Sequence, residues 1–170
     1  MKKVFFLAAL LVCSIAAQAQ RFALVDMEYI LKQIPAYGQA NQQMESLSKQ
    51  WQSEVEAKAQ EAKTMYDEYQ KNASNLSATQ KTAQENAIIA KEKEAADLRK
   101  KYFGPEGEGM KKRQELITPI QDAIYNAIKD IATQKNYDAV IDRASAQSMI
   151  FASPRIDISN EVLAKLGYSN

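Results

Sequence analysis

Two aspartates at the ends of short apolar runs are the residues best placed for acid–base chemistry. Asp26 follows the run Phe22–Val25. Asp142 follows the run Ala139–Ile141. A pair of carboxylates can act as general acid and general base, but the chain contains no His, and no Gly-rich phosphate loop accompanies either residue. Such aspartates more often cap helices and turns, so we predict that the protein is not an enzyme.

The composition excludes several other classes of site. The 170 residues include 22 Lys or Arg, 21 Asp or Glu and no His. Without His there is no His-based catalytic triad, no imidazole zinc ligand and no histidine pH switch. A net charge of +1 argues against a nucleic-acid binder, which needs a basic surface for its phosphate contacts. The sequence lacks a G-x-x-x-x-G-K-[ST] loop, and we expect no nucleotide, metal or other cofactor.

Two basic runs are candidates for contact with phosphate or lipid headgroups. They are Arg99-Lys100-Lys101 and Lys111-Lys112-Arg113. Each run has acidic neighbours in the sequence: Glu92, Glu94 and Asp97 for the first, and Glu106, Glu108 and Glu115 for the second. Mixed charge favours a solvated face, which leaves open a weak contact with a membrane surface.

Residues 1–19 have the organisation of a secretory signal peptide. Lys2 and Lys3 precede the apolar stretch Val4–Ala17, and Ala17-Gln18-Ala19 forms a small-x-small cleavage site. Cleavage after Ala19 would leave 151 residues with 20 basic and 21 acidic side chains, a net charge of −1. We therefore predict that the protein is exported.

The one Cys of the chain, Cys13, lies in this segment. A rival interpretation is a lipoprotein signal in which Cys13 carries the lipid. The bulky Val12 directly before Cys13, and the small-x-small site downstream, argue against it. The exported chain would then fold without disulfides.

A long segment without helix breakers dominates the middle of the chain. Gln39–Phe103 is 65 residues without Gly or Pro and is rich in Ala, Glu, Lys and Gln, a composition that favours helix. Lys71–Ser77 interrupts it with turn-forming residues, and Ser77 with Gln80 fits a capping box. We predict an antiparallel helical hairpin with its tip near residues 72–77.

The hairpin should be poorly packed. Only 13 of its 65 residues are large and apolar, compared with 29 of 79 in the flanks 21–38 and 110–170. Apolar residues recur at the three- and four-residue steps of a coiled coil: Met44, Leu47, Trp51, Val55, Ala62, Tyr66, Tyr69, Ala73 and Leu76. A narrow, Ala-rich contact buries little area. Its far end should bend or fray readily.

The flanks predict a small α+β body. Short β-type runs cover Phe22–Asp26, Tyr137–Asp142 and Ser148–Ala152, and helices are expected over Met27–Gln33, around residues 110–135 and near the C-terminus. Pro119 marks either a new helix start or a kink. Three strands and short helices make a marginal core that usually needs disulfides, metals or oligomerisation. Because Cys and His are missing from the predicted exported chain, we expect oligomerisation.

Four stretches in this order resemble the Skp/OmpH family of periplasmic chaperones. They are Phe22–Met27, Ile120–Ile124, Tyr137–Asp142 and Ile156–Leu163. The resemblance covers residues 21–168, although in the hairpin it rests more on length and composition than on sequence. It implies a homotrimer in which strands of three subunits form a β-barrel body and three helical arms enclose a cavity. Family members hold unfolded outer-membrane proteins there and prevent their aggregation.

The resemblance gives a division of the chain and a set of candidate residues. Residues 1–19 are the signal peptide, 20–38 and 110–170 the trimerisation body, and 39–109 the coiled-coil-like arm. The expected client contacts are apolar side chains of the arm that adapt to varied partners: Met44, Trp51, Met65, Tyr66 and Tyr69. The expected trimer contacts are Phe22, Leu24, Val25, Val140, Ile141, Ile150 and Phe151.

Two alternatives to this interpretation stay open. Trp51 and Tyr69 have coiled-coil spacing, so they fit equally well as packing residues of the hairpin. The whole chain would also fit a structural coiled-coil adaptor of the cell envelope that binds one folded partner. Family members are strongly basic, whereas residues 39–103 carry ten basic and ten acidic side chains. Electrostatic capture of acidic clients is therefore not expected.

Overall fold

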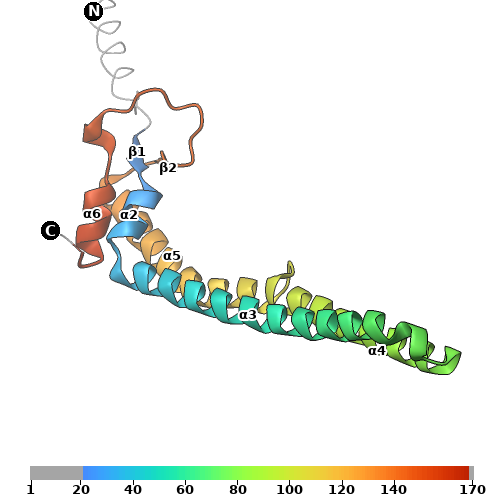
Figure 1. Ribbon diagram of the computed structural model, residues 1–170. Coiled ribbons are helices and arrows are strands. Elements are labelled where there is room, and N and C mark those ends of the chain that lie inside the picture. Colours follow the sequence, from blue (N-terminus) through green and yellow to red (C-terminus); the bar gives the residue numbers. More distant parts are fainter. Residues whose placement is uncertain (1–20, 169–170) are drawn as a thin grey trace, which may run out of the picture. The chain divides into compact units, whose positions relative to one another are not determined.

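The computed structural model describes residues 21–168 and divides into two compact units. Unit 1 comprises the chain up to Ile34 and from Asp122 onward, and unit 2 is Pro35–Gln121. The predicted signal peptide and Cys13 lie outside the described residues. No helix in the described range 21–168 is both long and apolar enough to cross a membrane. The chain order of the elements can be followed in Figure 1.

Unit 1 is built on a parallel pair of strands from opposite ends of the chain. Strand β1 (Phe22–Val25) pairs with β2 (Ala139–Asp142), with Phe22 opposite Ala139 and Val25 opposite Asp142. Asp157 adds an isolated parallel bridge to Leu24 on β1. Both strands were predicted from their apolar runs. Their pairing shows that the N-terminal and C-terminal segments fold together.

The prediction of a third strand over Ser148–Ala152 is wrong for the single chain. Within residues 21–168 the strands are β1 and β2, and residues 148–152 form no regular secondary structure. Ile150 and Phe151 are 101% and 84% exposed. An isolated strand is not stable without a neighbouring backbone to complete its hydrogen bonds, and the single chain provides none at this segment.

Helices complete the core of unit 1. Helix α2 (Met27–Gln33) packs against α6 (Ser159–Lys165), and the later part of α5 (Glu108–Lys135) supplies a buried stripe. The apolar residues of α5 recur at helical spacing and so lie on one face, with Ile124 and Ile131 buried. The most enclosed side chains are Ile30, Ile124 and Val162. The core therefore draws on both ends of the chain.

Two predicted caps form. The Asp26 carboxylate accepts a hydrogen bond of 2.8 Å from the Tyr29 backbone N–H and so begins α2. Ser77 and Gln80 make a reciprocal capping box that begins α4. These caps satisfy backbone N–H groups that have no partner inside the helix.

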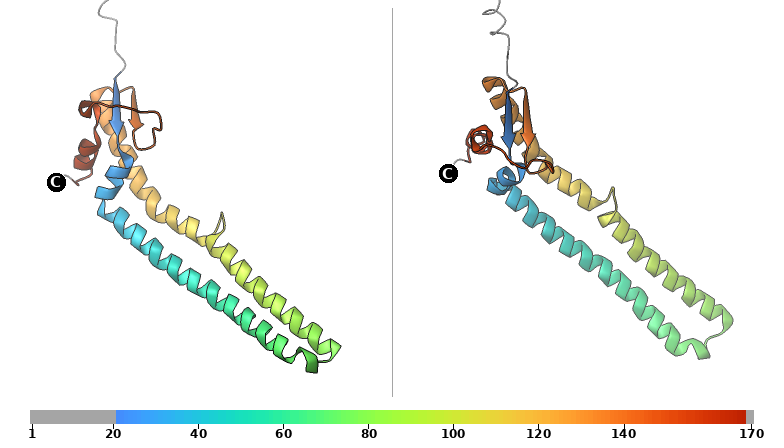
Figure 2. Two further views of the ribbon diagram at one scale, coloured as in Figure 1. Left: turned by 45° about the horizontal axis from the view of Figure 1, so that its top comes forward. Right: turned by 90° about the horizontal axis from the view of Figure 1, so that it is seen from above.

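Unit 2 contains the helical hairpin. Helix α3 (Pro35–Asn72) leads through a short 3₁₀ turn (Ala73–Asn75) into α4 (Ala78–Phe103). The two helices lie side by side and antiparallel in both views of Figure 2. The tip falls where the sequence predicted it, because Ser and Asn residues there favour turns and caps over helix.

Helix α5 begins at Glu108 after a four-residue break. Pro119 lies inside α5, so the structure excludes the alternative of a new helix start there. The proline ring removes one backbone donor from the helix. The helix nonetheless continues from Glu108 to Lys135.

Candidate functional site

The hairpin has a thin buried contact that we call the hairpin seam. Its buried members are Val55 and Ala62 on α3 and Ile88 and Ala95 on α4. Two of the four are Ala, whose small side chain buries little area. The seam is therefore under-filled, and shallow cavities open beside it.

One cavity lies toward the tip. It has a volume of about 230 Å³, and its lining combines apolar and polar side chains: Met65, Glu68, Tyr69, Asn72, Gln84, Ala87 and Ile88. The Tyr69 hydroxyl donates a hydrogen bond to the Glu85 carboxylate across the two helices. That hydrogen bond raises the pKa of Tyr69 above its ordinary value. Met65 and Tyr69 thus border a space that an apolar side chain could enter.

A second cavity lies farther from the tip. It has a volume of about 330 Å³ and is lined by Ala59, Ala62, Lys63, Tyr66, Glu92 and Ala95. Tyr66 is 45% exposed there. The structure therefore brings three of the five predicted client-contact residues to openings in the seam: Met65, Tyr66 and Tyr69.

Trp51 is placed differently. Its ring stacks on Tyr102 with centroids 5.2 Å apart and an angle of 13° between the planes, and Phe103 meets it edge-on at 6.4 Å. Such aromatic pairs stabilise packing. Trp51 therefore packs between the helices of the hairpin, as the alternative interpretation of the sequence expected. Met44, the fifth candidate, is half-buried on α3.

Ion pairs cover the hairpin surface with balanced charge. Lys91 on α4 pairs with Glu94 at 2.8 Å and reaches Glu61 on α3 at 3.7 Å, while Glu61 pairs with Lys58 at 3.1 Å. The Glu94 contact, followed by Glu61, raises the pKa of Lys91. These exposed pairs contribute little stability. The charged lining residues of the second cavity are Lys63 and Glu92, and that of the cavity toward the tip is Glu68.

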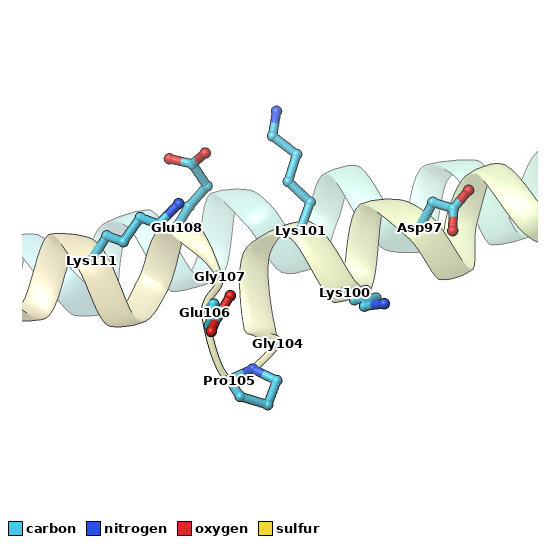
Figure 3. Close-up of a pocket in the computed structure, with 9 residues that line it drawn as sticks. All are labelled: Asp97, Lys100, Lys101, Gly104, Pro105, Glu106, Gly107, Glu108 and Lys111. Carbon is cyan, nitrogen blue, oxygen red and sulfur yellow. The ribbon is translucent and has the colours of Figure 1, made fainter.

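A further open space in unit 2 lies at the break between α4 and α5. It measures about 600 Å³ and is lined by Asp97, Lys100, Lys101, Gly104, Pro105, Glu106, Gly107, Glu108 and Lys111. Figure 3 shows Pro105 and Glu106 looped out of the helical path. Three acidic and three basic side chains line this space. The sequence predicted such a mixed, solvated face for both basic runs.

The predicted trimer contacts divide into a buried and an exposed group. Leu24 and Val25 are buried within the single chain, and Val140 is half-buried. The other four predicted contacts are exposed apolar side chains: Phe22 at 44%, Ile141 at 43%, Ile150 and Phe151.

The candidate carboxylates have structural roles. Arg143 lies 3.1 Å from an Asp26 oxygen and 3.3 Å from an Asp157 oxygen. The Asp142 carboxylate accepts hydrogen bonds from the backbone N–H groups of Met27 and Ala144. Within residues 21–168, no group of three or more metal-ligating side chains comes together.

Sequence reasoning missed several exposed apolar residues of the helices: Ile89, Phe103, Met110 and Tyr125. Phe103 and Met110 flank the Gly-rich break. Their position next to the glycines was the signal in the sequence that could have identified them. A helix break removes the next helical turn, which would otherwise cover such an apolar side chain.

A model of the family described as outer membrane protein (OmpH-like) matches residues 21–166. The chain is 28% identical over 158 residues to the Chaperone protein Skp of Yersinia enterocolitica, covering 92% of each chain. It is 28% identical over 154 residues to the protein of that name from Photorhabdus laumondii, covering 90% of each. The solved structure of an OmpH-like protein from Caulobacter crescentus matches with a TM-score of 0.68 at 11% identity, over 89% of this chain and 86% of that one. The last match is one of fold alone. The chain belongs to the outer membrane protein (OmpH-like) family.

Proposed function

We propose that the protein is a periplasmic chaperone that holds unfolded outer-membrane β-barrel proteins and prevents their aggregation without ATP. The observation that carries this proposal is the under-filled hairpin seam, with Met65, Tyr66 and Tyr69 at its openings. Relatives that cover nine-tenths of the chain are named as chaperones. Their name supports the holding of a client in preference to catalysis.

The work of such a chaperone is binding without chemistry. An unfolded barrel strand is apolar on alternate residues and cannot yet bury that face. Scattered Met and Tyr side chains provide many weak contacts that suit varied sequences. The client stays mobile, and its exposed strand edges are kept from pairing with other chains.

Three copies would form the working unit. The exposed apolar residues Phe22, Ile141, Ile150 and Phe151 of unit 1 would be buried between subunits. The segment around Ile150 would then gain the strand partners that the single chain lacks. Pooling the strands into a β-barrel removes free sheet edges, and the three hairpins would surround a cavity for the client.

Charge would contribute little to capture. Residues 39–103 carry ten basic and ten acidic side chains. Several of them are paired on the hairpin surface. We therefore expect client affinity to depend weakly on salt, and any contact with a membrane surface to be weak. The predicted signal peptide supports a periplasmic location.

Two measurements test the proposal. Sedimentation gives the mass in solution, for which we expect a homotrimer. Light scattering then follows a urea-unfolded outer-membrane barrel after dilution, with and without the protein. We expect suppression of scattering at about one trimer per client, and much weaker suppression by the double variant Met65→Ser, Tyr66→Ser. Tyr125→Ser is the matched control, because Tyr125 is 63% exposed outside the hairpin.

A monomer, or unsuppressed scattering, would overturn the proposal. The adaptor hypothesis would gain support from saturable one-to-one binding to a single native protein together with no effect on unfolded barrels.

A further inference from the structure

Beside the open space at the break between α4 and α5, the backbone of the break lies close against the end of α4. The Gly104 N–H donates to the Lys100 carbonyl at 2.9 Å, and the Gly107 N–H donates to the Gly104 carbonyl at 2.9 Å. A Cβ atom on Gly107 would lie 2.8 Å from the carbonyl oxygens of both Lys101 and Tyr102. The backbone at Gly107 therefore abuts the last turn of α4 at a distance that only glycine permits.

An aromatic side chain of α3 lies beside the break between α4 and α5. Trp51 on α3 stacks on Tyr102, which belongs to the last turn of α4. A Cβ atom on Gly109, in the first turn of α5, would lie 3.5 Å from the Trp51 ring and 3.0 Å from the Tyr102 carbonyl oxygen. The Trp51 ring thus stacks on Tyr102 before the break and lies close to Gly109 after it.

A polar contact fixes the ring on which Trp51 stacks. The Tyr102 hydroxyl donates a hydrogen bond to the Glu54 carboxylate, one helical turn beyond Trp51 on α3. Gln50 Nε2 donates to the same carboxylate at 3.0 Å. Tyr102 is therefore tied to α3 through both its ring face and its hydroxyl group.

We propose that Trp51, Tyr102 and Glu54 form a latch that holds the Gly104–Gly107 break closed, and that the break opens when Trp51 leaves the Tyr102 ring. Trp51 is then a positioning residue of the hairpin and makes no direct client contact. The latch belongs to unit 2 alone and operates with or without a client.

The proposal predicts that a change in the latch alters the break and that a change in the break alters the latch, and both effects can be measured. Trp51 is the only tryptophan in the sequence, so its fluorescence reports on the latch, while hydrogen exchange of residues 100–111 reports on the break. For Tyr102→Ala we expect exchange in that segment to rise by about tenfold, with little change at residues 85–95. For Gly107→Ala, which alters no aromatic residue, we expect Trp51 emission to shift to the red and acrylamide quenching to increase.

Tyr69→Ala is the matched control. Tyr69 makes the other cross-helix hydrogen bond from Tyr to Glu, near the tip, and its loss should speed exchange near the tip and leave residues 100–111 unchanged. Tyr102→Phe keeps the ring and should restore most of the protection lost in Tyr102→Ala. Unchanged exchange at 100–111 in Tyr102→Ala, or an equal rise along all of α4, would overturn the latch. So would unchanged Trp51 emission in a folded Gly107→Ala protein. If Gly107→Ala does not fold, the two Tyr102 variants decide the question by themselves.

Discussion

Arg143 Nε lies 3.3 Å from the Asp157 carboxylate, and the same guanidinium reaches Asp26 at 3.1 Å. These three residues come from the segment after β2, the bridge residue beside β1 and the cap of α2. Arg143 therefore joins three segments far apart in the sequence. Asp26, one of the two carboxylates that first suggested acid–base chemistry, therefore takes part in ion pairing within unit 1.

Replacing this arginine should weaken unit 1 modestly. For Arg143→Ala we expect the free energy of unfolding to fall by about 1 kcal/mol, because the arginine side chain is 45% exposed and such pairs are screened by water. Urea unfolding followed by circular dichroism measures the change. Arg155→Ala is the control, since Arg155 donates to the Ser153 hydroxyl group nearby. Equal stability of the two variants would show that the Arg143 pairs contribute nothing.

The exposed segment around Ile150 predicts that one substitution can prevent assembly of the subunits without unfolding them. Ile150 is fully exposed in the single chain, so Ile150→Asp should leave the helical circular dichroism of a subunit intact. In a trimer it would bury an unpaired charge at a cost of several kcal/mol, roughly 3–5. We expect sedimentation to give monomers. Ile89→Asp, a similar change on the hairpin where Ile89 is 61% exposed, should stay assembled. A fully assembled Ile150→Asp protein would place the interface elsewhere.

The hydrogen bond between Tyr102 and Glu54 predicts how Trp51 fluorescence depends on pH. Tyr102 lowers the pKa of Glu54 below its ordinary value of 4.5, so the stabilisation is present above 4.5 and disappears as the pH falls through the lowered pKa. Glu54 raises the pKa of Tyr102 above 10.0, so the stabilisation is present below 10.0 and disappears as the pH rises through the raised pKa.

Trp51 emission should therefore be constant between these limits and change at both ends. Glu54→Gln should remove the acid transition, because the amide does not titrate. Persistence of the same acid transition in Glu54→Gln would assign it to another group.

The capping box predicts a local effect at the tip. Ser77→Ala removes the hydroxyl group that accepts from the Gln80 backbone N–H at 3.3 Å. We expect a loss of about 1 kcal/mol, the usual cost of deleting such a cap, seen as faster hydrogen exchange over the first turn of α4. Exchange at residues 100–111 serves as the internal control and should not change. A protein with unaltered exchange after Ser77→Ala would show that the tip is held by other contacts.

Local signals were sufficient for much of the fold. The Ser77–Gln80 box, the Asp26 cap and the helical spacing of Ile124 and Ile131 depend on residues a few positions apart, which a sequence displays directly. Strands β1 and β2 and the long helical hairpin were predicted for the same reason. The third strand failed because a strand needs a neighbour, and Ile150 has none within its own chain.

The site was less accessible from sequence. Coiled-coil spacing put Trp51 and Tyr66 in the same class, although one stacks on Tyr102 and the other borders a cavity. The difference depends on which residue of α4 lies opposite each position: Tyr102 lies opposite Trp51, and Glu92 and Ala95 lie near Tyr66. Neither composition nor periodicity contains this information, because it depends on contacts between residues far apart in the sequence.

The central claim is that the hairpin seam holds unfolded clients, and photo-crosslinking tests it most directly. A photoreactive residue at position 66 should crosslink to many positions of a urea-diluted outer-membrane barrel, and should give few crosslinks to the same barrel once it is folded. The same residue at position 125 should give little with either. Strong crosslinks from 125 with none from 66, or equal crosslinking to folded and unfolded barrels, would contradict the account.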